Sequence, residues 1–280
     1  MNPDQNPMGD SIEHSDKPIK LGQPHDDPWV DLRKLTTARI ALGRAGGSLQ
    51  TRDHLDFRLA HARARDAVWS PFDPGLLAQQ LESLGNDVIV LGSATADRAE
   101  YLRRPDLGRK LGKSDREKLL CEMNAKERYD LVIVISDGLS TAAVMSQTVP
   151  LVMALFPHLS RAGWKIAPLI VVKNGRVAIQ DEIGEICRAE ISLMLIGERP
   201  GLGSSDSLGA YFTYAPGMNK TDADRNCVSN IRQQGIIPVD AAQKLFNLLN
   251  ASRKLRLSGV RLKDDIVGLE ESPAPEALGA

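Results

Sequence analysis

Three short polar turns carry the side chains with the clearest chemical potential, and each turn follows an apolar run of strand length. They are Ser136-Asp137-Gly138, Lys173-Asn174-Gly175 and Gly197-Glu198-Arg199. Ligands of open α/β sheets bind beyond the carboxyl ends of the strands, so these turns are expected to line one crevice. They supply charge and hydrogen-bonding groups but no paired nucleophile and general base. The pattern predicts a binding site for a large ligand with polar edges, and no catalytic residue.

Other patterns of catalytic or metal-binding residues are missing from the sequence. The five histidines do not have the spacing of metal ligands. No GxGxxG follows a strand, and neither a Walker A lysine motif nor a G-x-S-x-G segment is present. Cys121, Cys187 and Cys227 form no CxxC pair, which favours free thiols in a reducing compartment. We therefore predict no metal ligand in this chain.

The elements that would position the three turns follow from the order of apolar and polar runs. Helical segments between buried strands predict an α/β fold with a Rossmann-like, mostly parallel sheet. Asn174-Gly175 predicts a hairpin turn with a return strand over 177–180. A polar loop is expected over 218–232. The other predicted elements are strands at 87–91, 129–135, 166–172, 191–196 and 209–215, the last an edge or hairpin strand, and helices at 28–42, 51–69, 74–84, 114–126, 141–162, 181–188 and 238–257.

The sequence predicts four regions along the chain. Residues 1–23 are expected to be a disordered leader, 24–84 a small N-terminal helical domain, 85–265 the Rossmann-like domain, and 266–280 a flexible tail. Within the second domain, Pro150 and Pro157 are expected to interrupt the helix predicted over 141–162.

Composition excludes several classes of partner. A formal net charge of -1 gives no broad positive field for nucleic acid, and 4% aromatic residues provide few platforms for base stacking. No apolar run approaches the roughly 18 residues of a membrane span, and no secretory signal is visible. We expect a cytoplasmic protein without nucleic-acid or membrane partners.

Six segments, in this order, carry a resemblance to a known family. They are TTARIALGRAGG at 36–47, YLRRPDLGRKL at 101–111, VIVISDGLST at 132–141, NGRVAIQDEIGEI at 174–186, IGERPGLGSSDSLGAY at 196–211 and DRNCVSNI at 224–231. The chain resembles the small (light) subunit of ethanolamine ammonia-lyase over about 29–259.

The resemblance implies a function that the residues alone do not reveal. Such enzymes are carbon–nitrogen lyases that convert ethanolamine to acetaldehyde and ammonia with adenosylcobalamin. The resemblance places the radical steps on a large subunit, within a hetero-oligomer, and the corrin at the interface between the subunits. It implies cobalamin contacts at Val177, Glu198 and Cys227, with Cys227 as a packing contact, a small buried hydrophobe rather than a reactive thiolate.

Sheet geometry adds Ser136, Asp137 and Arg199 as weaker candidates for the same site. The sequence contains no D-x-H-x-x-G motif, so the resemblance implies that the cofactor binds base-on. Some relatives carry an amphipathic leader for a bacterial microcompartment. Residues 1–23 show no apolar stripe and give no support to such targeting.

Two other classes of function are weighed beside this one. The chain could be a stand-alone α/β enzyme that acts on a phosphorylated metabolite, with SDGLST and GERPG as phosphate-binding loops. It could also be an assembly subunit that docks a partner through its arginine-bearing helices.

Overall fold

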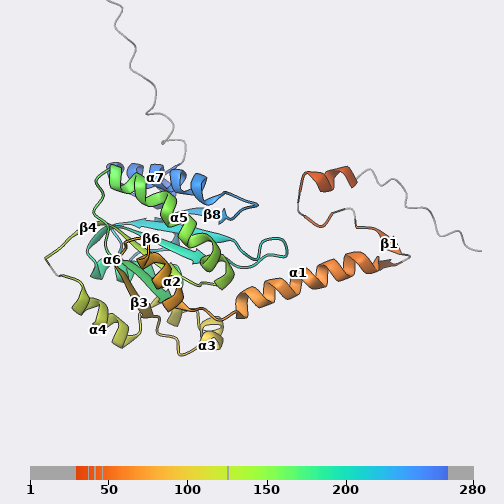
Figure 1. Ribbon diagram of the computed structural model, residues 1–280, viewed down its shortest axis with the longest axis horizontal. Helices are drawn as coiled ribbons and strands as arrows, with labels where there is room; N and C mark the ends of the chain where they lie inside the picture. The colour runs from red at the N-terminus through yellow and green to blue at the C-terminus, as the bar shows by residue number, and fades with distance from the viewer. Residues whose placement is uncertain (1–29, 37, 41, 46, 125, 264–280) are drawn as a thin grey trace, which may run out of the picture. The chain divides into compact units, whose positions relative to one another are not determined.

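The computed structural model describes residues 30–36, 38–40, 42–45, 47–124 and 126–263 (Figure 1). Contacts within the chain divide it into two units, Met1–Asp53 and His54–Ala280. The second unit contains the large sheet and is the one that matters for the candidate site.

The described part of the first unit has little regular structure. It contains a 3-10 helix, η1 (Val30–Lys34), and a two-residue antiparallel ladder of β1 (Arg44–Ala45) and β2 (Ser48–Leu49). The helix expected over 28–42 is therefore wrong within the described residues, and its first two positions lie outside them. Leu35 is 83% exposed, so the apolar positions of that pattern are not buried. A short helix without a packed face is marginal in water.

The second unit is built on a mixed sheet. Within the described residues it has six strands, in the spatial order β3 (Val88–Gly92), β5 (Leu169–Lys173), β4 (Tyr129–Ser136), β6 (Ala189–Gly197), β7 (Leu208–Tyr214) and β8 (Arg225–Ile231). The first four are parallel, and β7 and β8 are antiparallel to their neighbours. This confirms an α/β fold with a mostly parallel sheet. Of the edge and hairpin positions expected for β7, the hairpin position is confirmed, because β7 pairs antiparallel with β8, the next strand in the chain. The loop expected over 218–232 is wrong where β8 forms, at the edge of the sheet.

Helices cover the sheet on both faces. Helices α2 (Pro74–Glu82), α5 (Thr141–Arg161) and α7 (Pro238–Leu255) pack against one face through buried leucines such as Leu77, Leu155 and Leu245. Helices α4 (Lys113–Glu122) and α6 (Ile179–Ile186) cover the other, where Leu119 and Ile183 are buried. Near this second face lie α3 (Arg98–Arg103) and the 3-10 helix η2 (Leu107–Arg109).

Helix α5 differs from its prediction in two ways. It is continuous, with Pro150 and Pro157 inside it. By length and composition it is also apolar enough to cross a membrane, although the sequence analysis found no such run. Its buried face, which includes Val144, Leu151 and Leu159, packs in the core against the sheet and α7. The apolar composition of α5 is therefore explained by its place in the core.

The hairpin predicted at Asn174-Gly175 is also wrong. Strand β5 pairs in parallel with β3 on one side and β4 on the other, so no free edge is available for a return strand. Asn174 does take the left-handed conformation (φ 57°) that such turns use, but the chain then enters α6.

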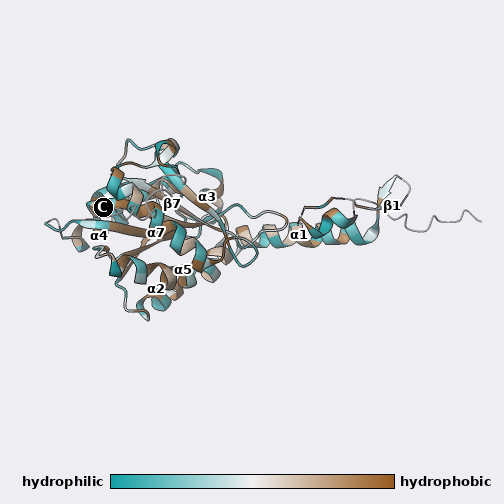
Figure 2. Cartoon of the chain, turned by 90° about the horizontal axis from the view of Figure 1, so that it is seen from above, coloured by the Kyte–Doolittle hydropathy of each residue, from teal (hydrophilic) through white to brown (hydrophobic). Residues whose placement is uncertain are grey.

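The helices of the predicted N-terminal domain differ in how they pack. Helix α1 (Thr51–Trp69) forms as predicted, with hydrophilic and hydrophobic residues alternating along it (Figure 2). Leu55 and Leu59 on it are about half exposed. Helix α2, in contrast, belongs to the core of the sheet through Leu77 and Leu81. The domain boundary at residue 84 stays a prediction.

Candidate functional site

The carboxyl ends of the parallel strands are closed by hydrogen bonds among themselves. Asp137 is only 1% exposed, and its Oδ2 lies 2.7 Å from Arg98 Nη1. Its Oδ1 accepts from the backbone N–H of Asn174 at 2.7 Å and from Ser136 Oγ at 3.1 Å. Burial raises the pKa of Asp137, and the charge of Arg98 opposes that shift. Ser136 and Asp137 thus join two strand ends through their hydrogen bonds.

The end of β6 closes the same region from the other side. The carbonyl of Gly197 accepts from the backbone N–H of Leu139 at 2.8 Å. A Cβ at Gly197 would overlap the carbonyl oxygens of Asp137 and Ser140, so this position needs glycine for close approach. The single crevice expected between the three turns is filled by these contacts.

The start of α5 is covered as well, which bears on the phosphate-binding alternative. Ser140 Oγ accepts from the backbone N–H of Ala143 at 3.2 Å and donates to the carbonyl of Ser205 at 2.6 Å. Thr141 Oγ1 donates to the carbonyl of Ser70 at 3.1 Å. The hydroxyl groups of Ser140 and Thr141 in the SDGLST turn therefore form hydrogen bonds within the protein.

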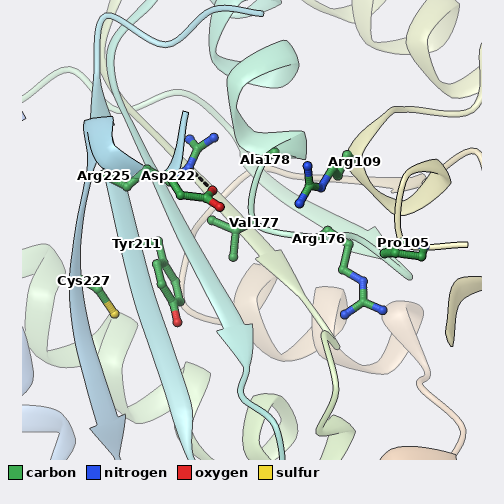
Figure 3. A pocket seen from close by; sticks show the side chains of 9 residues that line it. All are labelled: Pro105, Arg109, Arg176, Val177, Ala178, Tyr211, Asp222, Arg225 and Cys227. Atoms are coloured by element: carbon green, nitrogen blue, oxygen red, sulfur yellow. Dashed lines mark hydrogen bonds and ion pairs between the residues drawn. The ribbon is translucent and has the colours of Figure 1, made fainter. Parts of the chain in front are cut away.

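An open hollow of about 440 Å³ lies beside this region, next to the start of α6 (Figure 3). The turn before α6, the 3-10 helices η2 and η3 (Asp222–Asp224), and the adjoining face of β7 and β8 supply its walls. Its lining residues are Pro105, Arg109, Arg176, Val177, Ala178, Tyr211, Asp222, Arg225 and Cys227. We take this hollow as the candidate site.

Tyr211 and Cys227 form the sheet wall of the hollow, facing each other in the antiparallel register of β7 and β8. The Cys227 side chain is exposed, so its expected role as a small buried hydrophobe is wrong; Cys187 is the buried cysteine. Neighbouring protein atoms still shield the thiol, and this desolvation, with the charge of Glu198, raises the pKa of Cys227 to about 11. Cys227 is a neutral thiol at neutral pH.

Glu198 borders this wall and is held by three donors. Its Oε2 accepts from Ser207 Oγ at 2.6 Å and from the backbone N–H of Asn230 at 3.2 Å, and its Oε1 accepts from Ser229 Oγ at 2.5 Å. A Cβ at Gly209 would lie 2.9 Å from Glu198 Oε1 and 2.8 Å from Tyr211 Cε2. The glycine thus lets the carboxylate lie beside the tyrosine ring.

An irregularity in β8 makes this arrangement possible. The pairing of β7 with β8 shifts register between Leu208 and Ala210, and Asn230 has a φ of 61°. Bulges re-aim side chains and backbone groups. Here the extra residue brings both Ser229 and Asn230 to Glu198.

A buried ion pair fixes β8 to α6 below the hollow. Arg225 Nη1 and Nη2 each lie 2.8 Å from a carboxylate oxygen of Asp181, and Nη1 also donates to Thr213 Oγ1 at 3.0 Å. Burial raises the pKa of Asp181, while its hydrogen bonds from Arg225 lower it. Asp222 is a second, more distant partner at 3.4 Å from Arg225 Nε.

The sequence-predicted residues fall into three groups. Val177 and Cys227, 50 positions apart in the chain, line the hollow, and Glu198 adjoins it through Tyr211. Ser136 and Asp137 lie in the closed network. Arg199 is exposed beyond β6. The assignment of these residues to a cofactor stays a prediction.

Sequence reasoning missed the other seven lining residues, among them Tyr211, Arg225, Arg109 and Arg176. The signal for Arg225 was the spacing of two from Cys227, which places both on one face of a strand. That signal was lost because the segment was interpreted as a loop.

Two further observations concern metal ligands and a second hollow. Among the residues that the structure describes, no three histidine, cysteine or acidic side chains gather as metal ligands. A larger, shallower hollow of about 610 Å³ lies where β4 and β6 begin, at Tyr129 and Ala189. Ligands of α/β sheets bind at the opposite, carboxyl ends.

Comparison with known proteins gives a consistent result over nearly the whole chain. A family model described as ethanolamine ammonia-lyase light chain matches residues 26–263. A protein of Pseudomonas fluorescens (strain SBW25) is 48% identical over 263 residues, which cover 93% of this chain and 95% of the relative. A protein of Pseudomonas putida (strain GB-1) is 51% identical over 241 residues, which cover 86% of this chain and 89% of the relative. Both relatives are named ethanolamine ammonia-lyase small subunit.

Proposed function

Because the chain belongs to the ethanolamine ammonia-lyase light-chain family, the small subunit of a carbon–nitrogen lyase, we propose that it forms one wall of an adenosylcobalamin site shared with a larger subunit. The reaction converts ethanolamine to acetaldehyde and ammonia. When bound, the cofactor supplies the radical that starts this elimination, on the large subunit. The role of this chain is to bind and orient the cofactor and to keep water away from it.

One observation carries the proposal: segments far apart in the sequence meet at one hollow. Val177 precedes α6, Glu198 follows β6 and Cys227 lies on β8, and all three lie in or beside the same depression. The family resemblance implies cobalamin contacts at the same three residues. Residues that merely share a family motif have no need to lie together.

The chemistry of the hollow fits a corrinoid. A corrin is broad and apolar across its face and carries amide side chains around its rim. Val177 and Ala178 offer apolar contact, and the Glu198 carboxylate can accept from an amide N–H. The Tyr211 hydroxyl adds a second polar group, and a donor nitrogen of Arg176 is buried without a hydrogen-bond partner among the described residues. No histidine is among the described lining residues, which suits a cofactor that keeps its own base on the cobalt.

The decisive experiment is reconstitution with the large subunit. Coexpression of both chains is expected to give a complex that carries the cobalamin absorption and releases ammonia from ethanolamine only when adenosylcobalamin is present. Full activity from the large subunit alone would exclude the proposal. Turnover of a phosphorylated substrate by this chain alone, without cobalamin, would favour the stand-alone enzyme instead.

The proposal also covers where the complex works. All three cysteines, Cys121, Cys187 and Cys227, are free thiols. Free thiols suit the reducing cytoplasm. We place the complex there, as an assembly without nucleic-acid or membrane partners.

A further inference from the structure

Charge is distributed unevenly around the hollow. At one end, Arg225 is neutralised by Asp181 and Asp222. At the other end, Arg109 and Arg176 lie near the start of α6, and no carboxylate of the described lining residues pairs with either of them. This second end has an excess of positive charge that no described lining carboxylate balances.

Arg176 is held in place in a way that keeps its charge at the hollow. Its guanidinium lies over the Tyr101 ring, 4.1 Å from the ring centre, and its Nη2 donates to the carbonyl of Tyr101 at 3.1 Å. Its Nε is buried and has no hydrogen-bond partner among the described residues. An unsatisfied buried donor is costly, so such a group in a native protein calls for an acceptor.

The backbone brings Arg109 to the same place. The backbone N–H of Arg176 donates to the carbonyl of Gly108 at 2.7 Å, which fastens η2 to the turn before α6. A Cβ at Gly108 would lie 2.8 Å from Arg176 Cγ, so only glycine allows this approach. Figure 3 shows the Arg109 guanidinium extending toward Val177 and Ala178.

Backbone donors complete this end of the hollow. The N–H groups of Val177 and Ala178 donate to no other residue in the described part of the chain. They precede the first turn of α6, where the helix dipole favours negative charge. The Arg109 guanidinium and these amides, with the charge of Arg176 at the same end of the hollow, are suited to an anion with several oxygens, such as a phosphate ester.

We propose that Arg109 and Arg176 bind the phosphodiester in the nucleotide loop of the cobalamin. This inference rests on the proposed function, because it names the part of that cofactor which this end of the hollow holds. The amides around the corrin rim are neutral, whereas the phosphodiester carries a negative charge. A base-on cofactor retains the nucleotide loop that contains it, and the arginine end of the hollow is the part with matching charge.

Three corrinoids separate the phosphate from the rest of the cofactor. Adenosylcobalamin has the phosphate and the base, adenosylcobinamide phosphate has only the phosphate, and adenosylcobinamide has neither. Dissociation constants are measured for each by equilibrium titration of the two-subunit complex. The wild-type complex is expected to prefer adenosylcobinamide phosphate to adenosylcobinamide by roughly tenfold or more, the value of a charge-assisted hydrogen bond.

The variants are Arg109→Gln and Arg176→Gln, with Arg104→Gln as the matched control. Arg104 lies on the same segment as Arg109, is exposed, and pairs with Asp106 at 2.7 Å, away from the lining of the hollow. Arg109 is also exposed, so its replacement leaves the fold intact even if loss of Arg176 does not. Arg109→Gln and Arg176→Gln are each expected to reduce the preference for adenosylcobinamide phosphate over adenosylcobinamide severalfold. Arg104→Gln should keep the preference.

The two levels of the proposal fail in different ways. If the wild-type complex binds none of the three corrinoids, the proposed function fails and this inference fails with it. If the complex binds corrinoids but shows no preference for the phosphate, or if Arg109→Gln keeps the full preference, the phosphate assignment alone is overturned.

Discussion

Glu198 is the residue where a structural role and a binding role overlap. Its carboxylate accepts from Ser207, Ser229 and Asn230, so it ties the end of β6 to β7 and β8. The same carboxylate lies beside Tyr211 at the edge of the hollow. Loss of this side chain therefore removes both an internal tether and a candidate acceptor for a cofactor amide.

We expect Glu198→Ala to weaken adenosylcobalamin binding by the complex about ten- to a hundredfold, since one charge-assisted hydrogen bond is worth about 1.5–3 kcal/mol. The fold should persist, because Glu198 is only half-buried. Equilibrium titration with the cofactor measures the affinity, and circular dichroism checks the fold.

Ser229→Ala provides the matched control for this change. It removes the 2.5 Å hydrogen bond to Glu198 Oε1 but leaves the carboxylate in place. If Glu198 acts only as a tether, Ser229→Ala, which removes one of its three hydrogen bonds, should itself lose a share of the affinity. If the carboxylate contacts the cofactor, Ser229→Ala should keep nearly the wild-type affinity while Glu198→Ala loses it. Equal dissociation constants for wild type and Glu198→Ala would contradict the cofactor role.

At the scale of elements, the contact between α6 and β8 depends on the Asp181–Arg225 pair. Both side chains are almost completely buried, and the pair is bidentate. Removing one partner leaves a charge uncompensated in the interior, which costs far more than the pair itself contributes.

We expect Asp181→Asn to lower the free energy of unfolding by about 3–5 kcal/mol, because Arg225 would lose its buried counter-charge. Urea denaturation measures the change. The double variant Asp181→Leu with Arg225→Met should recover part of the loss, since neither charge is then left alone. A double variant less stable than Asp181→Asn would contradict this explanation.

Strand β6 is buried on both faces, and Ile191 is completely buried. Ile191→Asp should prevent folding, because it places an unpaired charge between the two helical layers. Expression in the soluble fraction and circular dichroism report the outcome. Ile191→Val, which removes one methyl group, should cost only about 0.5–1.5 kcal/mol. A folded Ile191→Asp protein would contradict the burial assigned to β6.

The sequence predicted the buried strands well and the site-bearing strand poorly, for one physical reason. The apolar run within β6 has core neighbours on both faces and is recognisable by composition alone. In β8 only Val228 and Ile231 enter the core, and a bulge breaks the alternation. The remaining residues of β8 are polar apart from Cys227, so the strand has the composition of a loop.

The Asn174-Gly175 turn shows a second limit of local signals. The left-handed conformation predicted from Asn-Gly is present at Asn174. Whether a hairpin follows depends on a free sheet edge, and β5 has none. That property is set by strand order, which requires the whole fold.

At the scale of the whole molecule, the helical covering of the sheet is incomplete on one side. Helices α4 and α6 cover the parallel strands on the face that carries Tyr211. On β8, beyond them, Cys227 and Ser229 are exposed. A hollow with a wall on only one side suits the proposed role, in which a partner subunit supplies the remaining walls. Val177, Tyr211 and Cys227 come to this hollow from separate elements, a property that no single motif reveals.

Cysteine labelling tests this arrangement within one protein. Cys227 lies in the hollow and Cys121 lies on α4, outside it, and both are exposed. In the free chain, alkylation of Cys227 should be slow at pH 7, because a pKa of about 11 leaves almost no thiolate. The alkylation rate of Cys227 should rise about tenfold per pH unit below that pKa, since the thiolate fraction does so.

In the cobalamin-loaded complex, Cys227 should become protected from alkylation at pH 9 while Cys121 continues to react. Mass spectrometry of tryptic peptides measures both rates in one sample. Equal labelling of Cys227 in the free chain and in the loaded complex would show that this face of β7 and β8 stays open, which would contradict a shared cofactor site there.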